Sequence, residues 1–359
     1  MAPSAITDTP APTGAKQAAQ KDLPSPIHPS MIPRLDQDFI EYYNAYIAVK
    51  PVTHHVSMED VRKYPKLYAA SWAKDFTFEP FVNDIEIPGP DGNSIKTRCY
   101  TPDPRISPYG DGPYPIHINV HGGGFIFGDL TGDAELCMLV RDRVGIMVLD
   151  IDYRLSPEHV WYRGHEDVWA AFKWVREQGK SINANVDSIS MGGISAGGQI
   201  TAVCQQLARK EGYELKLALL AVPSVDDFIS LKQPNDSPYP SYQENALSPC
   251  LSWKRIAYCG EVINSALHKD GDVVRPNFWH SPIRGDLASL CRTFIATADC
   301  DPLRDEVETY GAKLAASGVH VTIRRYMGVP HPFMHMLLIR KGQEYVKDIC
   351  AQLTTAHSL

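Results

Sequence analysis

The chain has 359 residues, of which 44% are hydrophobic and 21% charged, a globular composition that suits one large domain with insertions or two smaller domains. Its formal net charge of −7 argues against nucleic-acid binding, which needs a basic face. No run of about eighteen apolar residues is present, so no membrane span is expected. The eight cysteines form no CxxC pair and no Cys/His cluster with zinc spacing, which predicts reduced thiols and no bound metal.

The first 30 residues are rich in Ala, Pro, Thr and Ser, a composition that predicts a flexible tail. This segment has no apolar core behind a basic start, so it does not resemble a secretory signal. It also contains no Arg, which transit peptides usually carry. The sequence therefore predicts a cytoplasmic location.

Two helices and a hairpin are expected after this tail. Apolar side chains recur at helical spacing over residues 34–50, and Pro51 ends that pattern. Ser57 is a suitable N-cap for a second helix that extends to about Ser71. Residues 81–89 and 94–102 flank the turn sequence Pro-Asp-Gly-Asn and predict a hairpin.

Strands and helices alternate from residue 114 onwards. The run 146–151 is short and continuously apolar, as expected of a strand that is buried on both faces. Repeated strand–helix units predict the α/β class, with a mainly parallel sheet covered by helices on both faces. Further strands are expected at 114–120, 188–194, 215–222, 292–298 and 319–326, and helices at 166–178, 196–210, 304–316 and 341–353.

The alternation breaks between Pro223 and about Pro276, where prolines and aromatic residues are frequent and one helix is expected at 252–266. This insertion and the N-terminal helices are the candidates for a lid or cap. The expected organisation is a tail over 1–30, a helical cap from 31–75 and 223–275, and a catalytic α/β domain from 76–222 and 276–359.

A candidate nucleophile lies in the motif Gly193-Ile194-Ser195-Ala196-Gly197, which fits G-x-S-x-G between a predicted strand and a predicted helix. The chain turns so tightly at such an elbow that both flanking positions need glycine. The serine then projects at a helix N-terminus, which favours developing negative charge. The motif alone is weak, because glycine and serine are common in loops. The strand–turn–helix context indicates Ser195 as the nucleophile.

The sequence His121-Gly122-Gly123-Gly124 follows the predicted strand at 114–120. Glycines allow backbone N–H groups to converge on the oxyanion that forms during acyl transfer. A flexible connection or a phosphate loop is also Gly-rich, but no Gly-Lys-Ser/Thr follows and the pattern is not G-x-G-x-x-G. Upstream of a serine elbow, this loop is interpreted as an oxyanion hole.

The candidate triad acids follow the predicted strand at 292–298, at the end of the sheet where parallel strands gather their sites. An acid in this arrangement comes after the serine and before the histidine. Asp299, Asp301 and Asp305 all satisfy this order, although Asp305 is expected to lie in or cap the next helix. The residues by themselves leave the choice among the three open.

His331 follows the last predicted strand, in a loop where an acid can orient its imidazole toward Ser195. His335 is the alternative base, but four residues further on it is expected to turn away. Arg154 and Glu158, in an upstream loop, are interpreted as a structural pair that fixes that loop and not as catalysts.

Five motifs together resemble the hormone-sensitive-lipase-like family of esterases, and their order and spacing are similar over roughly residues 80 to 340. The resemblance implies the α/β-hydrolase fold, a helical cap, no cofactor, and hydrolysis of esters with short to medium acyl chains. Members of the family often pair through the last strand and the helix after it, which implies a homodimer. The motifs are HGGGF (121–125), YRLSPEH (153–159), GISAGG (193–198), DPLRDE (301–306) and GVPHPF (328–333).

The resemblance also implies the role of each site residue. Two positions depart from the family pattern: Ile194 stands where Asp or Thr is common, and Pro332 where Gly is common. Neither change removes a catalytic group, so activity is expected with unusual substrate preferences. The implied roles are Ser195 as nucleophile, Asp301 as triad acid, His331 as base, and the backbone N–H groups of Gly123, Gly124 and Ala196 as oxyanion hole.

The sequence therefore predicts a serine carboxylesterase for small-molecule esters, with small to medium, apolar or aromatic substrates. A tailoring hydrolase, lactonase, amidase or acyltransferase would use the same triad. Some relatives of the family bind ligands after losing the histidine, whereas this chain keeps it. Aromatic side chains are candidate substrate contacts, with the alternative that they only join the cap to the core. The candidates are Phe125, Phe228, Tyr242 and Trp253.

Overall fold

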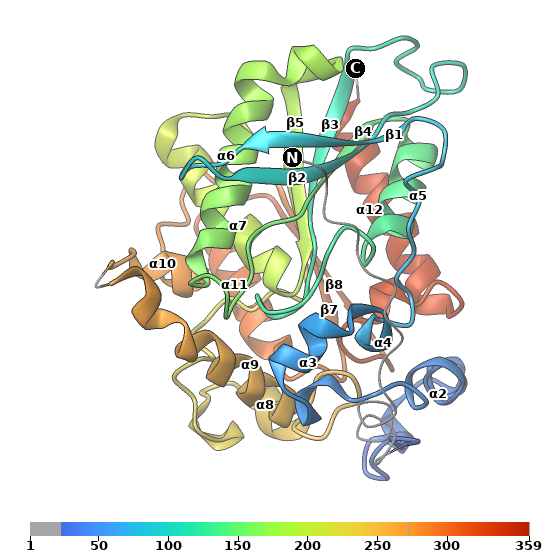
Figure 1. Cartoon of the computed structure of the whole chain (residues 1–359), viewed down its shortest axis with the longest axis vertical. Helices are drawn as coiled ribbons and strands as arrows, with labels where there is room; N and C mark the ends of the chain where they lie inside the picture. Colours follow the sequence, from blue (N-terminus) through green and yellow to red (C-terminus); the bar gives the residue numbers. More distant parts are fainter. Residues whose placement is uncertain (1–22, 272, 359) are drawn as a thin grey trace.

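A computed structural model describes residues 23–271 and 273–358 of the chain. Within these residues the centre is an eight-stranded sheet with the order β1-β2-β4-β3-β5-β6-β7-β8 (Figure 1). The pairings of β1 with β2 and of β2 with β4 are antiparallel, and the later pairings are parallel. The strands are β1 (Val82–Pro88), β2 (Ser94–Tyr100), β3 (Tyr114–Val120), β4 (Met147–Ile151), β5 (Ala184–Ile194), β6 (Leu217–Ala221), β7 (Thr293–Ala298) and β8 (Val321–Tyr326).

The burial of the strands follows from their place in the sheet. All residues of β4, β6 and β7 are buried, because helices cover both faces of these strands. β1 and β8 are the edge strands and carry exposed side chains. The predicted hairpin is confirmed, with a register that runs from Val82 opposite Tyr100 to Pro88 opposite Ser94.

Helices cover both faces of the sheet, as predicted (Figure 1). α5 (Ala134–Val144) and α12 (Arg340–His357) pack on one face. The bounds of α7 and α11 match the predicted helices to within one residue, whereas α6 begins four residues before the predicted Glu166. The helices of the other face are α6 (Tyr162–Gln178), α7 (Ala196–Glu211) and α11 (Arg304–Ala316).

The helix α5 was not predicted, although the sequence holds a local signal for its end. Gly145 follows the last helical residue with a φ of 73° and donates its N–H to the Arg141 carbonyl at 2.9 Å. Glycine adopts this left-handed conformation without a Cβ clash and commonly ends helices. Arg141 is itself buried among the apolar residues of α5, so the apolar periodicity of the segment is weak.

The segment before β1 is more ordered at its start than the sequence predicts. Residues 1–22 of the expected tail lie outside the described part of the chain. For residues 23–30 the prediction of a flexible tail is wrong, because Ile27 is buried and the Ser25 N–H bonds to the Ala48 carbonyl at 2.8 Å. The first predicted helix is replaced by α2 (Gln37–Tyr42) and a π-helical turn, η2 (Tyr43–Ile47).

Two short helices replace the second predicted helix, α3 (Met58–Lys63) and α4 (Pro65–Tyr68). The break falls before Pro65, because the residue that precedes a proline disfavours helical conformation. Ser57 caps α3 as predicted, since its hydroxyl oxygen accepts the Asp60 N–H at 3.1 Å.

The segment between β6 and β7 contains α8 (Ser241–Glu244), α9 (Trp253–Ser265) and α10 (Asn277–His280). α8 and α9 lie at the same end of the sheet as α3 and α4 (Figure 1). The Tyr258 hydroxyl in α9 donates to the Val56 carbonyl at 3.2 Å, a contact between residues 202 positions apart. The insertion and the N-terminal segment therefore bind each other directly.

Short 3₁₀ turns complete the architecture. In residues 23–271 and 273–358, no helix combines the length and the hydropathy that a membrane crossing requires. The turns are η1 (Ile32–Arg34), η3 (Thr53–His55), η4 (Gly179–Ile182), η5 (Pro234–Asp236), η6 (Leu267–Asp270), η7 (Pro282–Arg284) and η8 (Phe333–His335).

Candidate active site

Ser195 lies in a sharp turn between β5 and α7, as the sequence predicts. Its backbone has a φ of 58° and a ψ of −119°, a conformation that residues with a side chain rarely adopt. The Ser195 N–H bonds to the Ala221 carbonyl at the end of β6 at 2.8 Å, which holds the turn against the neighbouring strand. This geometry is that of a nucleophile elbow.

Both glycines that flank the elbow are required by close backbone packing. A Cβ on Gly193 would lie 2.4 Å from the carbonyl carbon of Gly197. A Cβ on Gly197 would lie 1.9 Å from the carbonyl oxygen of Val120, the last residue of β3. The start of α7 is therefore pressed against the ends of β3 and β5, which explains the G-x-S-x-G spacing in steric terms.

The Gly-rich loop after β3 supplies free backbone donors. Gly123 and Gly124 have φ angles of 128° and 63°, and a Cβ on Gly123 would lie 2.0 Å from the Phe127 carbonyl oxygen. Within the described residues, neither glycine donates its N–H to a backbone carbonyl. Ala196 is the first residue of α7, where a helix leaves its N–H groups without intrahelical partners. All three N–H groups are therefore available to an anionic oxygen.

Asp301 and His331 form a buried pair at the same end of the sheet. The Nδ1 atom of His331 lies 2.9 Å from the Oδ2 atom of Asp301, and both residues are less than 5% exposed. The other carboxylate oxygen of Asp301 accepts the Leu303 N–H at 3.0 Å. The loops after β7 and β8 therefore deliver an imidazole that a carboxylate orients.

The hydroxyl of Ser195 and the imidazole of His331 line the same cavity. In the described part of the chain they are not hydrogen-bonded to each other, and such catalytic hydrogen bonds often tighten only when substrate binds. Two of the three groups of the candidate triad are thus paired, and the third faces the space that they share.

The alternative acids and the alternative base are engaged elsewhere. The Asp305 carboxylate bonds to Nε of Arg304 at 2.8 Å, and the Asp299 carboxylate lies 3.8 Å from the same guanidinium. The His335 Nε2 atom lies 2.6 Å from Asp133, and its ring stacks on a tryptophan. Asp301 with His331 is the one combination among these candidates in the described chain that forms a carboxylate–imidazole pair beside Ser195.

The interpretation of Arg154 and Glu158 as a pair with each other is wrong. Arg154 binds the carboxylates of Asp167 and Asp91, at 2.7 and 2.8 Å. Glu158 binds Arg62 of α3 at 2.8 Å instead. Both residues do fix the loop after β4, but through partners that the sequence order did not suggest.

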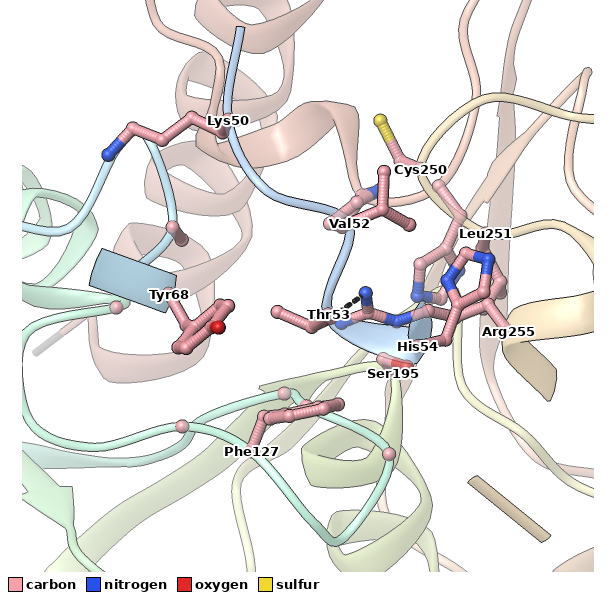
Figure 2. Close-up of a pocket in the computed structure, with 18 of the residues that line it drawn as sticks. Lys50, Val52, Thr53, His54, Tyr68, Phe127, Ser195, Cys250, Leu251 and Arg255 are labelled. Carbon is pink, nitrogen blue, oxygen red and sulfur yellow. Dashed lines mark hydrogen bonds between the residues drawn. The ribbon is translucent and has the colours of Figure 1, made fainter. Parts of the chain in front are cut away.

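The cavity that holds Ser195 and His331 has a volume of about 900 Å³, enough for a small to medium ligand. Figure 2 shows it from the side, with Phe127 of the Gly-rich loop below, Val52 and Thr53 above, and Tyr68 on the left. Cys250 and Leu251 of the insertion lie on the right. The N-terminal segment and the insertion therefore enclose the cavity over the ends of the strands.

The four aromatic candidates for substrate contact are not among the residues that line this cavity. Phe125 stacks on His165 with 5.7 Å between ring centroids, and Phe228 packs against the core. The Tyr242 hydroxyl donates to Glu306 at 2.9 Å, and its ring meets Trp253 edge to face. The rings of Phe228, Tyr242 and Trp253 join the insertion to the body of the protein, which is the alternative that the sequence left open, whereas Phe125 packs within the catalytic domain.

Sequence reasoning missed several side chains that line the cavity. Phe127 lies two residues beyond the HGGGF motif, and Tyr68 and Trp72 come from the segment around α4. Arg255 of α9 also lines the cavity, and burial lowers the pKa of its guanidinium. Burial and the Arg255 charge together lower the pKa of His54 to about 4, so His54 is neutral at pH 7. These residues come from segments without a motif, and only the tertiary structure brings them together.

A second buried carboxyl group lies close to the triad but outside the cavity. Glu306 accepts the Val225 N–H at 2.8 Å and the Tyr242 hydroxyl at 2.9 Å. Burial raises its pKa to about 8. Glu306 therefore ties α11 to the insertion. Among the residues described, no group of three or more His, Cys, Asp or Glu side chains is arranged to hold a metal ion.

Known proteins show the same fold and similar sequences. A family model described as alpha/beta hydrolase fold matches residues 117–335. Esterase LipI of Mycobacterium tuberculosis is 36% identical over 260 residues, which cover 70% of this chain and 75% of LipI. A hyperthermophilic esterase from the archaeon Pyrobaculum calidifontis is 32% identical with a TM-score of 0.67, over 76% of this chain and 85% of that one.

A bacterial heroin esterase is 25% identical with a TM-score of 0.76, and the match covers 90% of this chain and 98% of that one. The match to the family model spans the β3 loop, the elbow and the histidine loop, so it includes every motif on which the family resemblance rests. The chain therefore belongs to the α/β-hydrolase fold family and, within it, to the hormone-sensitive-lipase-like group that its motifs indicate.

Proposed function

We propose that this chain is a serine carboxylesterase that uses Ser195, His331 and Asp301 as its catalytic triad. The observation that carries the proposal is the buried His331–Asp301 pair, which opens onto the same cavity as a strained serine elbow. Esterase LipI and the Pyrobaculum calidifontis enzyme are named as esterases, which supports an ester as the substrate. The cavity suits esters of small to medium, apolar or aromatic molecules.

The first half of the reaction forms an acyl-enzyme. His331 takes the hydroxyl proton of Ser195 as Oγ attacks the ester carbonyl carbon, and Asp301 orients the imidazole and stabilises its charged form. The carbonyl oxygen becomes an oxyanion, which accepts hydrogen bonds from the N–H groups of Gly123, Gly124 and Ala196. His331 then gives the proton to the leaving alcohol as the bond between the carbonyl carbon and the alcohol oxygen breaks.

The second half returns the free enzyme. His331 takes a proton from water, and the resulting hydroxyl attacks the acyl carbon in the same oxyanion hole. The acid leaves when His331 returns the proton to Oγ of Ser195. Water attack makes the protein a hydrolase, whereas attack by a second alcohol would make it an acyltransferase.

The residues 31–75 and 223–275 act as a helical cap over the catalytic domain. Several contacts support this role. The Sγ atom of Cys259 in α9 lies so close to the Gly-rich loop that a Cβ on Gly124 would be 2.8 Å from it. The side chain of Asn245 donates to the backbone carbonyl of Asp301 at 3.0 Å. The cap therefore contacts both the oxyanion loop and the acid loop.

The proposal is tested with purified wild type and Ser195→Ala, assayed on p-nitrophenyl esters from acetate to dodecanoate and labelled with a fluorophosphonate. We expect turnover and labelling in the wild type, and a loss of roughly 10⁴-fold or more in kcat in the variant. The acyl chain length of the ester with the highest kcat/KM indicates the size of the acyl-binding site. Labelling without ester turnover would instead favour an amidase, lactonase or acyltransferase, to be assayed on matched substrates. A folded wild type that neither labels nor turns over contradicts the proposal.

Location and assembly are further parts of the proposal. All eight cysteines are free thiols, which suits the reducing cytoplasm. The edge strand β8 leaves Ile323 41% exposed, and Met327 just after it is 54% exposed, which suits pairing of two copies through this strand. Light scattering of the purified chain is expected to give the mass of a dimer, and an Ile323→Lys variant a monomer.

A further inference from the structure

Arg255 occupies an unusual position in the catalytic cavity. It is the third residue of α9, and its side chain reaches into the cavity between the two walls that Phe127 and Thr53 form (Figure 2). Its guanidinium donates to the Thr53 hydroxyl and lies over the Phe127 ring, 4.8 Å from the ring centroid. Ser195 is drawn beside it in the same view and lines the same cavity.

No carboxylate among the described residues forms an ion pair with Arg255. Two buried arginines of the chain, Arg98 and Arg304, are by contrast each paired with carboxylates. Arg98 pairs with Asp84 and Asp75 at 2.7 and 3.0 Å, and Arg304 pairs with two acidic side chains at 2.7 and 2.8 Å. Arg255 is half-buried in the cavity wall, and it differs from these structural arginines because it lacks an anionic partner.

The groups around Arg255 do not supply negative charge. The thiols of Cys250 and Cys259 have pKa values raised by burial to about 12 and 11, so both are neutral at pH 7. Three acidic residues line other parts of the cavity: Glu158 binds Arg62, Asp133 binds His335, and Asp129 accepts hydrogen bonds from Thr131. Lys254, which also lines the cavity, adds a second positive charge.

A guanidinium stays protonated in proteins and offers five N–H donors, of which Thr53 takes one. Removing such a cation from water is costly unless an anion or several hydrogen bonds compensate it, and the face of one aromatic ring compensates it only in part. Arg255 lines the cavity in which a substrate would lie, and within the described residues its guanidinium donates no hydrogen bond besides the one to Thr53. A planar carboxylate matches this fork of donors in geometry as well as in charge.

We propose that Arg255 binds a carboxylate group of the substrate, so that this protein prefers esters that carry a negative charge. This inference rests on the proposed esterase function. The carboxylate belongs either to the acyl part, as in a half-ester of a dicarboxylic acid, or to the alcohol part, as in an acylated hydroxy acid. In both cases Arg255 acts by holding the substrate and setting specificity, and Ser195 carries out the same chemistry.

The test compares esters that differ only in charge. For the acyl part, mono-(4-nitrophenyl) succinate is compared with its methyl ester. For the alcohol part, 4-acetoxybenzoate is compared with methyl 4-acetoxybenzoate. Wild type is expected to show a kcat/KM at least about 10-fold higher for the charged member of one pair, and the pair that responds identifies which part of the substrate carries the carboxylate.

The variants Arg255→Met and Arg255→Lys are measured on the same pairs. Arg255→Met is expected to lower kcat/KM for the preferred charged ester about 100-fold and to change that of its neutral partner less than about threefold. Arg255→Lys is expected to retain part of the preference. Lys254→Met is the matched control, because it removes a neighbouring positive charge from the same helix and cavity. A general electrostatic attraction would make both methionine variants lose the preference equally, which overturns the proposal.

The outcomes separate this inference from the proposed function. Turnover of neutral esters with no preference for charge in wild type overturns the role of Arg255 and leaves the esterase intact, and this result needs no folded variant. An equal loss on charged and neutral esters in Arg255→Met assigns Arg255 a structural role and also overturns the proposal. Failure of wild type to label with a fluorophosphonate and to hydrolyse any ester overturns both proposals.

Discussion

The elbow region and the cap region of this protein are built from different kinds of contact. Around Ser195 the backbones of β3, β5 and α7 touch directly, so that a Cβ on Gly197 would lie 1.9 Å from the Val120 carbonyl oxygen. In the cap, long side chains join segments far apart in sequence, as in the hydrogen bond from Tyr258 to Val56. Contacts of the first kind leave a signature of glycines in the sequence, whereas contacts of the second kind leave none.

The largest difference in kcat between a variant and its matched control is expected at the triad acid. Asp301→Asn should lower kcat by roughly 10⁴-fold, because an amide neither orients the imidazole correctly nor stabilises its charge. Asp299→Asn is the matched control, two residues earlier and 3.8 Å from Arg304, and should change kcat less than about threefold. Steady-state kinetics on p-nitrophenyl acetate and circular dichroism of each variant check this. A larger loss in the control would move the acid to Asp299.

A second comparison places the same substitution in one helix of each region. Gly197→Ala should destabilise the fold by about 3 kcal/mol or abolish folding, since the added Cβ clashes with backbone. Gly260→Ala in α9 adds a Cβ whose nearest neighbour is 3.8 Å away, and should raise stability by about 0.5–1 kcal/mol. Urea unfolding measures both. Equal effects would show that the two regions are packed alike.

A third prediction addresses the link between the regions. Asn245 is fully buried and donates to the Asp301 carbonyl, so Asn245→Ala should loosen the acid loop and lower kcat about 10-fold. The KM should change little, because Asn245 contacts the acid loop and does not line the cavity. Gln243→Ala, at an exposed position of the same segment, is the control and should behave as wild type. A change in KM alone would contradict a positioning role.

A fourth prediction concerns the pH dependence of stability, to which the buried Glu306 contributes. Its pKa is about 8 in the folded chain and about 4.3 in an unfolded chain, so between these values the folded chain holds a proton that the unfolded chain releases. Glu306 therefore lowers the free energy of unfolding progressively as the pH rises from about 5 to 8. Glu306→Gln should flatten this part of the stability profile, measured by urea unfolding at several pH values. An unchanged slope would show that Glu306 ionises normally.

Sequence patterns predicted those parts of the fold whose structure depends on residues close together in the chain. The parallel strands are apolar because both faces are covered, and the helices that follow them begin at turns with recognisable residues, so both left signals along the chain. The N-terminal helices were predicted too long, because Pro65 and the π-helical turn after Tyr42 interrupt a periodic pattern that looked continuous. α5 was missed because Arg141, a charged residue, is buried within it.

The residues of the candidate site also fall into two groups, those that local sequence patterns predicted and those that they did not. Ser195, His331 and the glycines of the oxyanion loop were predicted, since each follows a strand of a parallel sheet in a fixed order. The choice of Asp301 over Asp299 and Asp305 depended on the family resemblance and agrees with the pair that the structure forms with His331. The four aromatic candidates do not line the cavity: Phe228, Tyr242 and Trp253 bury the inner face of the cap, and Phe125 stacks on His165 within the catalytic domain.

The sequence by itself determined the chemistry of this protein, because a serine elbow, an oxyanion loop and a histidine after the last strand depend on local turns and on strand order. Only the tertiary structure decided what surrounds that chemistry. Thr53, Phe127 and Arg255 come from three separate segments and meet because the cap folds back over the sheet. Side-chain contacts over such distances depend on how whole layers pack, and residue spacing along the chain carries no record of them.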